Sequence, residues 1–169
     1  MASIVPRDET HWHELRRTHI GASESAALFG LSPWLTPWQL YHIKRGALPG
    51  MADNDVLRTG RHFEPAIASY AADKFDLRLQ KVHRYISDDA TPGMGASLDY
   101  ETAEGERMPA EIKMSLFGDG WEWEGDRLTS APEHYIIQCQ HQIAVTNAKS
   151  ALLIAWAGFN VRTMLIPRS

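Results

Sequence analysis

Two charged residues interrupt an apolar run at residues 108–114, MPAEIKM. In a strand, successive side chains point to opposite faces of the sheet, so Glu111 and Lys113 would lie on one face and Ile112 on the other. A charged pair would then project from a strand whose other residues suit a core. Any fold for this chain therefore has to bury one face of the strand and accommodate an adjacent acid and amine on the other.

Helices are expected in the first half of the chain and again near its end. Ser23 is expected to cap one helix, and the segment 36–46 opens with Thr-Pro and closes with Gly, as helices often do. Helical spacing of apolar residues predicts a third helix at 60–75, in which Pro65 either starts the regular part or bends it. A fourth helix is expected at 132–145.

Strands are expected between and after these helices. The expected strands are 94–100, 108–114, 150–156 and 161–166, with the polar turn 102–107 between the first two and a Trp-rich loop at 117–130. The order of helices and strands predicts an α/β fold.

Length and composition limit the number of domains and the cell compartment. With 169 residues, 44% of them apolar, residues 1–169 are expected to form a single domain with a core of ordinary size. The single cysteine, Cys139, excludes an internal disulfide and a site built from several thiolates. No run of roughly 18 apolar residues is present, so no membrane partner is expected and a cytoplasmic location is favoured.

The charge of the chain is unevenly distributed. A net charge of -4 argues against a protein that coats DNA by charge alone, although a nuclease remains compatible with it. Acidic residues concentrate in 99–126, whereas residues 1–62 hold seven basic and six acidic residues and five histidines. A DNA-facing surface is therefore expected in the N-terminal half.

The strand 94–100 brings a second acid toward the charged pair. If it lies beside 108–114, Asp99 comes close to Glu111, and two carboxylates with the carbonyl of Ile112 are the hard oxygen ligands that Mg²⁺, or Mn²⁺, prefers. Such an ion polarises a phosphate, activates a bound water and neutralises the leaving oxygen. Lys113 would orient or deprotonate that water or stabilise developing charge. A surface strand with a salt-bridged Glu and Lys explains the same residues equally well by itself.

An Asp followed by Glu-x-Lys on the next strand resembles the PD-(D/E)XK nuclease superfamily. Asp99, Glu111, Ile112 and Lys113 occupy its motif positions, although the Pro of the superfamily name is absent here. The resemblance implies a restriction-endonuclease-like core, in which a mixed central β-sheet is flanked by α-helices.

The segment WHELRRTHIGASES, residues 12–25, resembles the opening of the YqaJ-type viral recombinase and phage lambda exonuclease family. That resemblance places Arg16 and Ser23 at DNA phosphate-binding positions. The physical argument agrees, because a helix N-terminus capped by Ser23 would present free N–H groups and partial positive charge beside Arg16. Ordinary capping and a surface arginine are the alternative.

Two further segments resemble helices of the same family. In TGRHFEPAIASYA the resemblance implies that Glu64 is an additional acid facing the metal site. In YIIQCQHQIAVT it implies that Gln138 reaches the active site, and helical spacing puts Tyr135, Gln138 and Gln142 on one face. Without this context, an isolated surface Glu and a satisfied structural amide would be the simpler interpretations.

Other residues give weaker evidence for a functional site. His11 and His13 have no third ligand at a spacing suited to zinc. Cys139 is expected to be a small buried hydrophobe. Trp121 and Trp123 are expected to pack in the core or at its rim, with stacking on an unpaired base as the alternative.

The family resemblance implies a Mg²⁺-dependent exonuclease that digests one strand of linear double-stranded DNA from its end, in the 5′ to 3′ direction, during phage-type recombination. It also implies a homotrimeric ring and a single-strand-annealing partner protein. A ring would hold a threaded duplex without a strongly basic surface.

Two other functions stay open. One is a structure-specific or single-cut endonuclease with the same chemistry, and the other is a catalytically inactive module that binds DNA ends. The chain also ends soon after the last expected strand, so it is either a minimal family member or C-terminally short.

Overall fold

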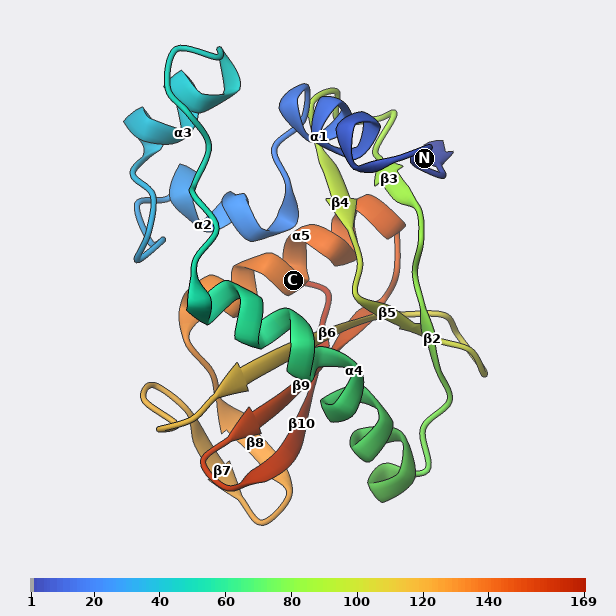
Figure 1. Ribbon diagram of the computed structural model, residues 1–169. Coiled ribbons are helices and arrows are strands. Elements are labelled where there is room, and N and C mark those ends of the chain that lie inside the picture. The colour runs from blue at the N-terminus through green and yellow to red at the C-terminus, as the bar shows by residue number, and fades with distance from the viewer. Residues whose placement is uncertain (1) are drawn as a thin grey trace.

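The computed structural model describes residues 2–169 and combines helices with two β-sheets (Figure 1). The helices are α1 (Glu9–Arg17), the short 3-10 helix η1 (Ala22–Glu24), α2 (Ser25–Leu28), α3 (Pro37–Lys44), α4 (Asp55–Phe75) and α5 (Glu133–Thr146). The strands are β1 (Ala2–Ile4), β2 (Leu79–Lys81), β3 (Tyr85–Ser87), β4 (Gly95–Ser97), β5 (Tyr100–Thr102), β6 (Pro109–Ser115), β7 (Glu122–Glu124), β8 (Arg127–Ser130), β9 (Ser150–Ala157) and β10 (Asn160–Pro167).

The larger sheet is mixed and has seven strands in the order β2-β5-β6-β9-β10-β8-β7. Its centre is the parallel pair β6 and β9, in which Glu111 lies opposite Leu153. β5 joins the other edge of β6 in antiparallel orientation, with Tyr100 opposite Ala110. The smaller sheet has the order β1-β3-β4. The predicted α/β fold is confirmed.

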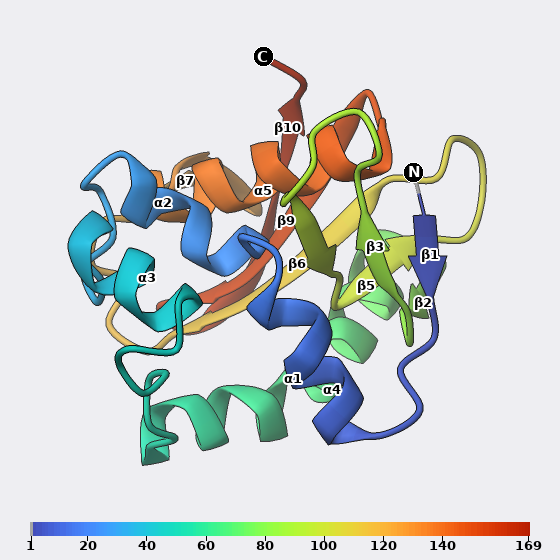
Figure 2. The same cartoon turned by 90° about the horizontal axis from the view of Figure 1, so that it is seen from above.

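Helices α4 and α5 cover opposite faces of the central strands (Figure 2). On one face Ile67 and Ala71 of α4 pack with Ile112 and Ile154. On the other face the apolar side of α5 packs against β9, in a cluster that includes Cys139, Ile143, Leu153 and Ala155. Because side chains alternate along β6, its apolar residues turn to α4 and its charged pair turns to α5.

Side-chain caps define the starts of α1, α3 and α4, and the start of η1 differs from expectation. Thr36 and Gln39 form a capping box at α3, as the Thr-Pro pair predicts. Ser23 is not a cap: Gly21 starts η1, with the side chain of Glu24 accepting a hydrogen bond from its backbone N–H at 2.8 Å. Ser23 itself is exposed in that turn.

Helix α4 begins earlier than the sequence predicts and runs through Pro65 without a break. The side chain of Asn54 accepts a hydrogen bond from the backbone N–H of Leu57 at 2.9 Å and so caps the helix. Pro65 removes one internal hydrogen bond, but most residues before it are exposed, so water can satisfy the freed carbonyl. The helix ends at Asp76, which has a left-handed conformation with φ 51°.

The segment expected to be one strand at 94–100 is divided between the two sheets. β4 pairs with β3 in the smaller sheet, and β5 pairs with β2 and β6 in the larger one. Leu98 and Asp99 form the connection between them. An uninterrupted strand was therefore wrong, because alternation of residue types does not show where a strand leaves one sheet for another.

The expected Trp-rich loop contains a hairpin, β7 and β8, at the edge of the larger sheet. Trp121 is buried, and Trp123 lies under the guanidinium of Arg162, 4.3 Å from the ring centre. Core packing is confirmed for Trp121, whereas Trp123 stays 38% exposed. Within residues 2–169, no helix combines the length and apolar character needed to cross a bilayer.

Candidate active site

Asp99 occupies the turn where the chain passes from the smaller sheet to the larger one. Its backbone carbonyl accepts a hydrogen bond from the N–H of Val82 at 3.1 Å. Its carboxylate accepts a hydrogen bond from the backbone N–H of Ile112 at 3.0 Å. Asp99 is thereby bonded to the middle of β6, one residue from Glu111, and the first two acids of the expected motif are brought together.

Glu111 is almost completely buried, with 2% of its surface exposed, yet its carboxylate is fully surrounded by donors. Lys113 Nζ lies 2.6 Å from Oε1 and forms an ion pair with it. Gln138 Nε2 donates to Oε1 at 2.6 Å and Gln142 Nε2 donates to Oε2 at 2.5 Å. These partners make ionised Glu111 tolerable in the interior and fix its orientation.

The two acids and the amine perturb one another. Desolvation, and then the negative charge of Glu111, raise the pKa of Asp99 well above its ordinary value, while Lys113 opposes this and Glu64 adds to it. Burial disfavours the ammonium of Lys113, but Glu111 and Asp99 outweigh it and hold its pKa above the ordinary value. In the metal-free protein Lys113 is therefore a cation that can donate hydrogen bonds or neutralise charge. It is one positive charge beside two carboxyl groups, Asp99 and Glu111.

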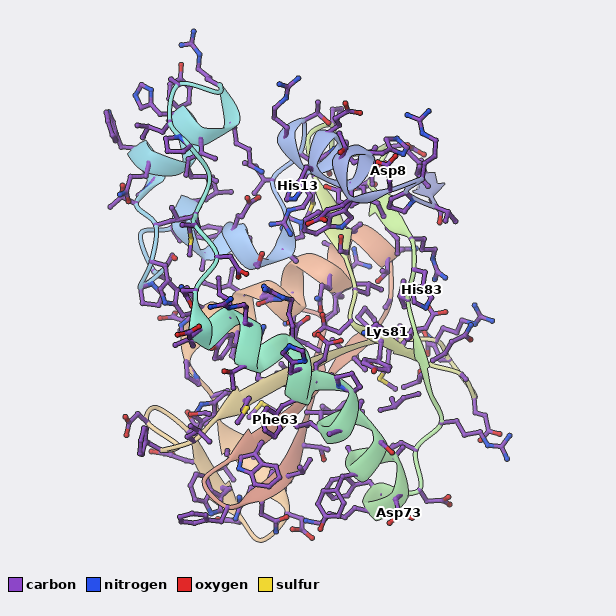
Figure 3. The ribbon with its side chains drawn as sticks, in the orientation of Figure 1. Asp8, His13, Phe63, Asp73, Lys81 and His83 are labelled. Atoms are coloured by element: carbon purple, nitrogen blue, oxygen red, sulfur yellow. The ribbon has the colours of Figure 1, made fainter. Side chains whose placement is uncertain are left out.

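Glu64 faces this cluster from α4. Its carboxylate accepts a hydrogen bond from Lys81 Nζ at 2.9 Å, and its charge is among those that raise the pKa of Asp99. Lys81 projects from β2 toward α4 (Figure 3). Glu64 immediately precedes Pro65 in α4. The sequence contained no signal for Lys81, because β2 reaches Glu64 only through its pairing with β5.

Helix α5 contributes three polar groups from one face, as its spacing predicts. Gln138 and Gln142 bind Glu111, and Lys113 Nζ lies 4.9 Å from the ring centre of Tyr135. Gln142 was not predicted to be a site residue, although the i, i+3, i+7 pattern placed it on the correct face. Cys139, next to Gln138, is fully buried among apolar residues of the sheet, and burial raises the pKa of its thiol. The interpretation of Cys139 as a small hydrophobe is confirmed.

Arg16 lies in a separate charged cluster above α5. Its guanidinium lies 4.6 Å from the ring centre of Trp12 and 3.7 Å from Glu24 Oε1. Lys44 Nζ is closer to the same carboxylate, at 2.7 Å from Oε2. Glu24 is thus shared by two cations, so positive charge remains available here. Ser23 lies in the adjacent turn, and a phosphate role for it must come from its hydroxyl or from the turn rather than from helix capping.

The donor set is compatible with a divalent ion of the Mg²⁺ type. Within residues 2–169, no three His, Cys, Asp or Glu side chains form a group that could hold a metal by themselves. The groups that meet are the carboxylate of Asp99, which is bonded to the Ile112 N–H, and the carboxylate of the adjacent residue Glu111. Mg²⁺ prefers oxygen ligands and keeps several waters, so two carboxylates and one carbonyl suffice. Burial and then the charge of Glu111 raise the pKa of Asp99, and a divalent cation bound between the two acids would offset both effects.

Comparison with known families agrees with this arrangement. The profile of the YqaJ-like viral recombinase domain matches residues 11–149. The chain belongs to this family. Protein YqaJ of Bacillus subtilis (strain 168), described as uncharacterized, is 30% identical over 147 residues. That match covers 85% of this chain but only 43% of the Bacillus protein, so the chain spans less than half the length of this relative.

Solved structures of a bacterial alkaline exonuclease share the fold. LHK-Exo from Laribacter hongkongensis has a TM-score of 0.65 and 17% identity, over 95% of this chain and 82% of that chain. Its complex with dAMP has a TM-score of 0.65 and 16% identity, over 95% and 83% of the two chains. The likeness establishes the architecture, and the expected mixed central sheet flanked by helices is confirmed.

Proposed function

We propose that this chain is a metal-dependent deoxyribonuclease that digests one strand of linear double-stranded DNA from its end. The observation that carries the proposal is the convergence of Asp99, Glu111 and Lys113, linked through the Ile112 N–H and the Glu111–Lys113 ion pair. The family, whose description is a viral recombinase domain, and the likeness to an alkaline exonuclease structure support it.

Asp99, Glu111 and the Ile112 carbonyl would hold Mg²⁺ or Mn²⁺. Bound there, the ion supplies charge neutralisation at the scissile phosphate and lowers the pKa of a water. Lys113 would orient that water, take its proton, or stabilise charge on the phosphate; in the metal-free protein Glu111 and Asp99 raise its pKa against the effect of burial. Gln138 and Gln142 hold Glu111 in one orientation.

Glu64 and Arg16 would add binding groups of opposite charge to the site. Glu64 adds negative potential at Asp99 and strengthens attraction for a cation. Arg16, with the hydroxyl of Ser23 nearby in sequence, would bind a phosphate of the degraded strand. Lys81 neutralises Glu64 in the described structure and becomes free to contact DNA if a cation takes over that carboxylate.

The biological setting follows from family resemblance rather than from the site. We infer 5′ to 3′ digestion in a phage-type recombination pathway in the bacterial cytoplasm, a homotrimeric ring, and a single-strand-annealing protein as partner. These inferences concern the whole protein, of which this chain matches only part in its Bacillus relative.

The test compares an end-labelled linear duplex with a covalently closed plasmid, each with Mg²⁺ and with excess chelator. We expect loss of the linear duplex alone, dependent on the metal, and lost in Lys113→Ala. Lys149→Ala is the matched control, because Lys149 is an exposed lysine whose partner is Glu106, outside the site. Release order from 5′- and 3′-labelled strands determines polarity.

Each other outcome identifies a different function. Cutting of the closed plasmid would favour the single-cut endonuclease. Cleavage that persists in excess chelator would contradict the metal-dependent mechanism. Binding of DNA ends without cleavage in any metal would favour the inactive end-binding module.

A further inference from the structure

Four aromatic rings form a continuous row beside the proposed catalytic lysine. Trp121, which precedes β7, lies 5.6 Å from Tyr135 of α5 between ring centres. His134 lies 4.0 Å from Tyr135. Trp34, from the connection between α2 and α3, lies 4.9 Å from His134 and 6.5 Å from Tyr135. Segments far apart in the sequence therefore build one aromatic row, which we call the Trp34 row.

The two ends of the Trp34 row differ in exposure. Trp121 is 6% exposed and belongs to the core cluster of α5 and the sheet. Trp34 is 54% exposed, although its edge-on contact with His134 holds it against α5. An indole with more than half its surface open to solvent loses free energy relative to burial unless something covers it. The row is thus anchored at Trp121 and open at Trp34.

The row also adjoins the proposed reaction centre. Lys113 Nζ lies 4.9 Å from the ring centre of Tyr135, which in turn lies 6.5 Å from the ring centre of Trp34. A cation that faces phosphate and an uncharged aromatic surface one ring away match the two halves of a nucleotide. Burial, and then Lys113, lower the pKa of His134, so the ring that supports Trp34 is neutral at physiological pH.

Resting on the proposed nuclease function, we propose that Trp34 stacks on the base of an unpaired nucleotide whose phosphate lies at the Asp99, Glu111 and Lys113 site. Trp34 then positions the degraded strand and favours substrate ends that can fray. Stacking is tolerant of sequence, because every base has an aromatic face. Of the two tryptophans in the loop after β6, Trp121 is buried, and Trp123 is 38% exposed but already has the Arg162 guanidinium over its ring.

The test uses a series of linear duplexes with one abasic residue at the first, second or third nucleotide of the degraded strand. With the wild-type chain and subsaturating DNA, we expect the cleavage rate to fall at one of these positions by between about 5- and 150-fold, the range for loss of one base–aromatic stack. Trp34→Leu should slow cleavage of intact DNA, yet show little further loss from the abasic residue at that position. Trp34→Phe should retain most of the position dependence.

Trp38→Leu is the matched control. Trp38 is 62% exposed on α3, close to Trp34 in sequence, but its ring packs on His42 of its own helix at 4.3 Å. It should behave as the wild type. Far-UV circular dichroism melting of each variant shows whether it is folded.

A second readout does not require cleavage. DNA carrying 2-aminopurine at the sensitive position, or at the first position if none is sensitive, is titrated with protein in Ca²⁺. Stacking on Trp34 should quench its fluorescence with the wild type and Trp34→Phe but not with Trp34→Leu.

The outcomes separate this inference from the proposed function. Cleavage by Trp34→Leu that keeps the full position dependence, or unchanged quenching in that variant, overturns stacking on DNA and leaves the nuclease intact. A wild type that cuts no DNA overturns the nuclease, and the quenching experiment then decides whether Trp34 binds a base at all. Equal slowing of intact and abasic DNA, with a lowered melting temperature, assigns Trp34 a purely structural role and also overturns the inference.

Discussion

Replacing Asp99 by Asn should make the metal-free protein more stable while removing its catalytic function. The pKa of Asp99 is raised by desolvation and by Glu111, so its ionisation at neutral pH costs stability in the absence of a cation. Asn has nearly the same shape, and its side-chain oxygen can still accept the hydrogen bond from the Ile112 N–H. The substitution thus removes a charge and little else.

The size of the effect is the difference between two contributions. Loss of charge assistance in the Ile112 hydrogen bond costs about 1 kcal/mol. Removal of an incompletely compensated buried charge stabilises by several kcal/mol in comparable settings. We therefore expect a net gain of about 1 to 3 kcal/mol in the free energy of unfolding. For a chain of this length, that corresponds to roughly 2 to 12 °C in melting temperature.

Thermal unfolding without Mg²⁺ measures how much Asp99 destabilises the metal-free protein, and unfolding with Mg²⁺ measures how much the bound ion stabilises it. At a free Mg²⁺ concentration of about a hundred times Kd, binding should stabilise the wild type by roughly 2.7 kcal/mol. The Asn variant should show a higher melting temperature without metal and a much smaller response to it. Asp119→Asn is the control, because Asp119 is an exposed acid of the loop after β6 and should show neither effect.

Two results would refute this reasoning. A lower melting temperature for Asp99→Asn without metal would mean that the carboxylate stabilises the fold, contrary to its raised pKa. An unchanged melting temperature of the wild type on addition of Mg²⁺ or Mn²⁺ would mean that the cluster does not bind the ion.

Three further predictions follow from the same contacts. Because the pKa of Asp99 is raised on folding, protonated Asp99 supports the folded state fully below about pH 4, and this support is lost as the pH rises through the folded pKa. The gain in the free energy of unfolding from Asp99→Asn should therefore be larger at pH 8 than at pH 5 in melts without metal. Gln138→Leu removes a donor from buried Glu111 and should lower the cleavage rate at saturating DNA by about 10- to 100-fold; an unchanged rate would exclude a positioning role. Burial raises the pKa of Tyr85 to about 12, and within residues 2–169 its hydroxyl has no hydrogen-bond partner, so Tyr85→Phe should stabilise by about 1 kcal/mol or be neutral in denaturant titrations, whereas a clear loss would reveal a hidden partner.

Much of the core and part of the site could be predicted from local patterns. Alternation in β6 placed Glu111 and Lys113 on one face, and helical spacing in α5 placed Gln138 and Gln142 on another face that meets it. The Thr-Pro start of α3 was also recognisable, because capping is a local interaction. Two of the predictions that were wrong concerned chain segments whose structure depends on remote partners.

One error is local and two arise from strand pairing. Ser23 lies in an ordinary cap sequence, but Gly21 starts the turn because Glu24 bonds back to it. The segment 94–100 alternates like a single strand, but its first part pairs with β3 and its last residue, in β5, pairs with β6. Residue alternation predicts the extended conformation but not the pairing partner. The Trp-rich segment forms a hairpin because β10 offers it an edge.

Local patterns were enough to nominate the candidate site residues and to place Glu111, Lys113, Gln138 and Gln142 on their faces of β6 and α5, because those faces follow from periodicities of a few residues. The tertiary structure alone decided that Asp99 meets β6 at a junction of two sheets, that Lys81 reaches Glu64, and that Trp34 joins a row of rings beside the site. Such meetings depend on strand pairing and helix packing between segments far apart along the chain, and no local pattern records them.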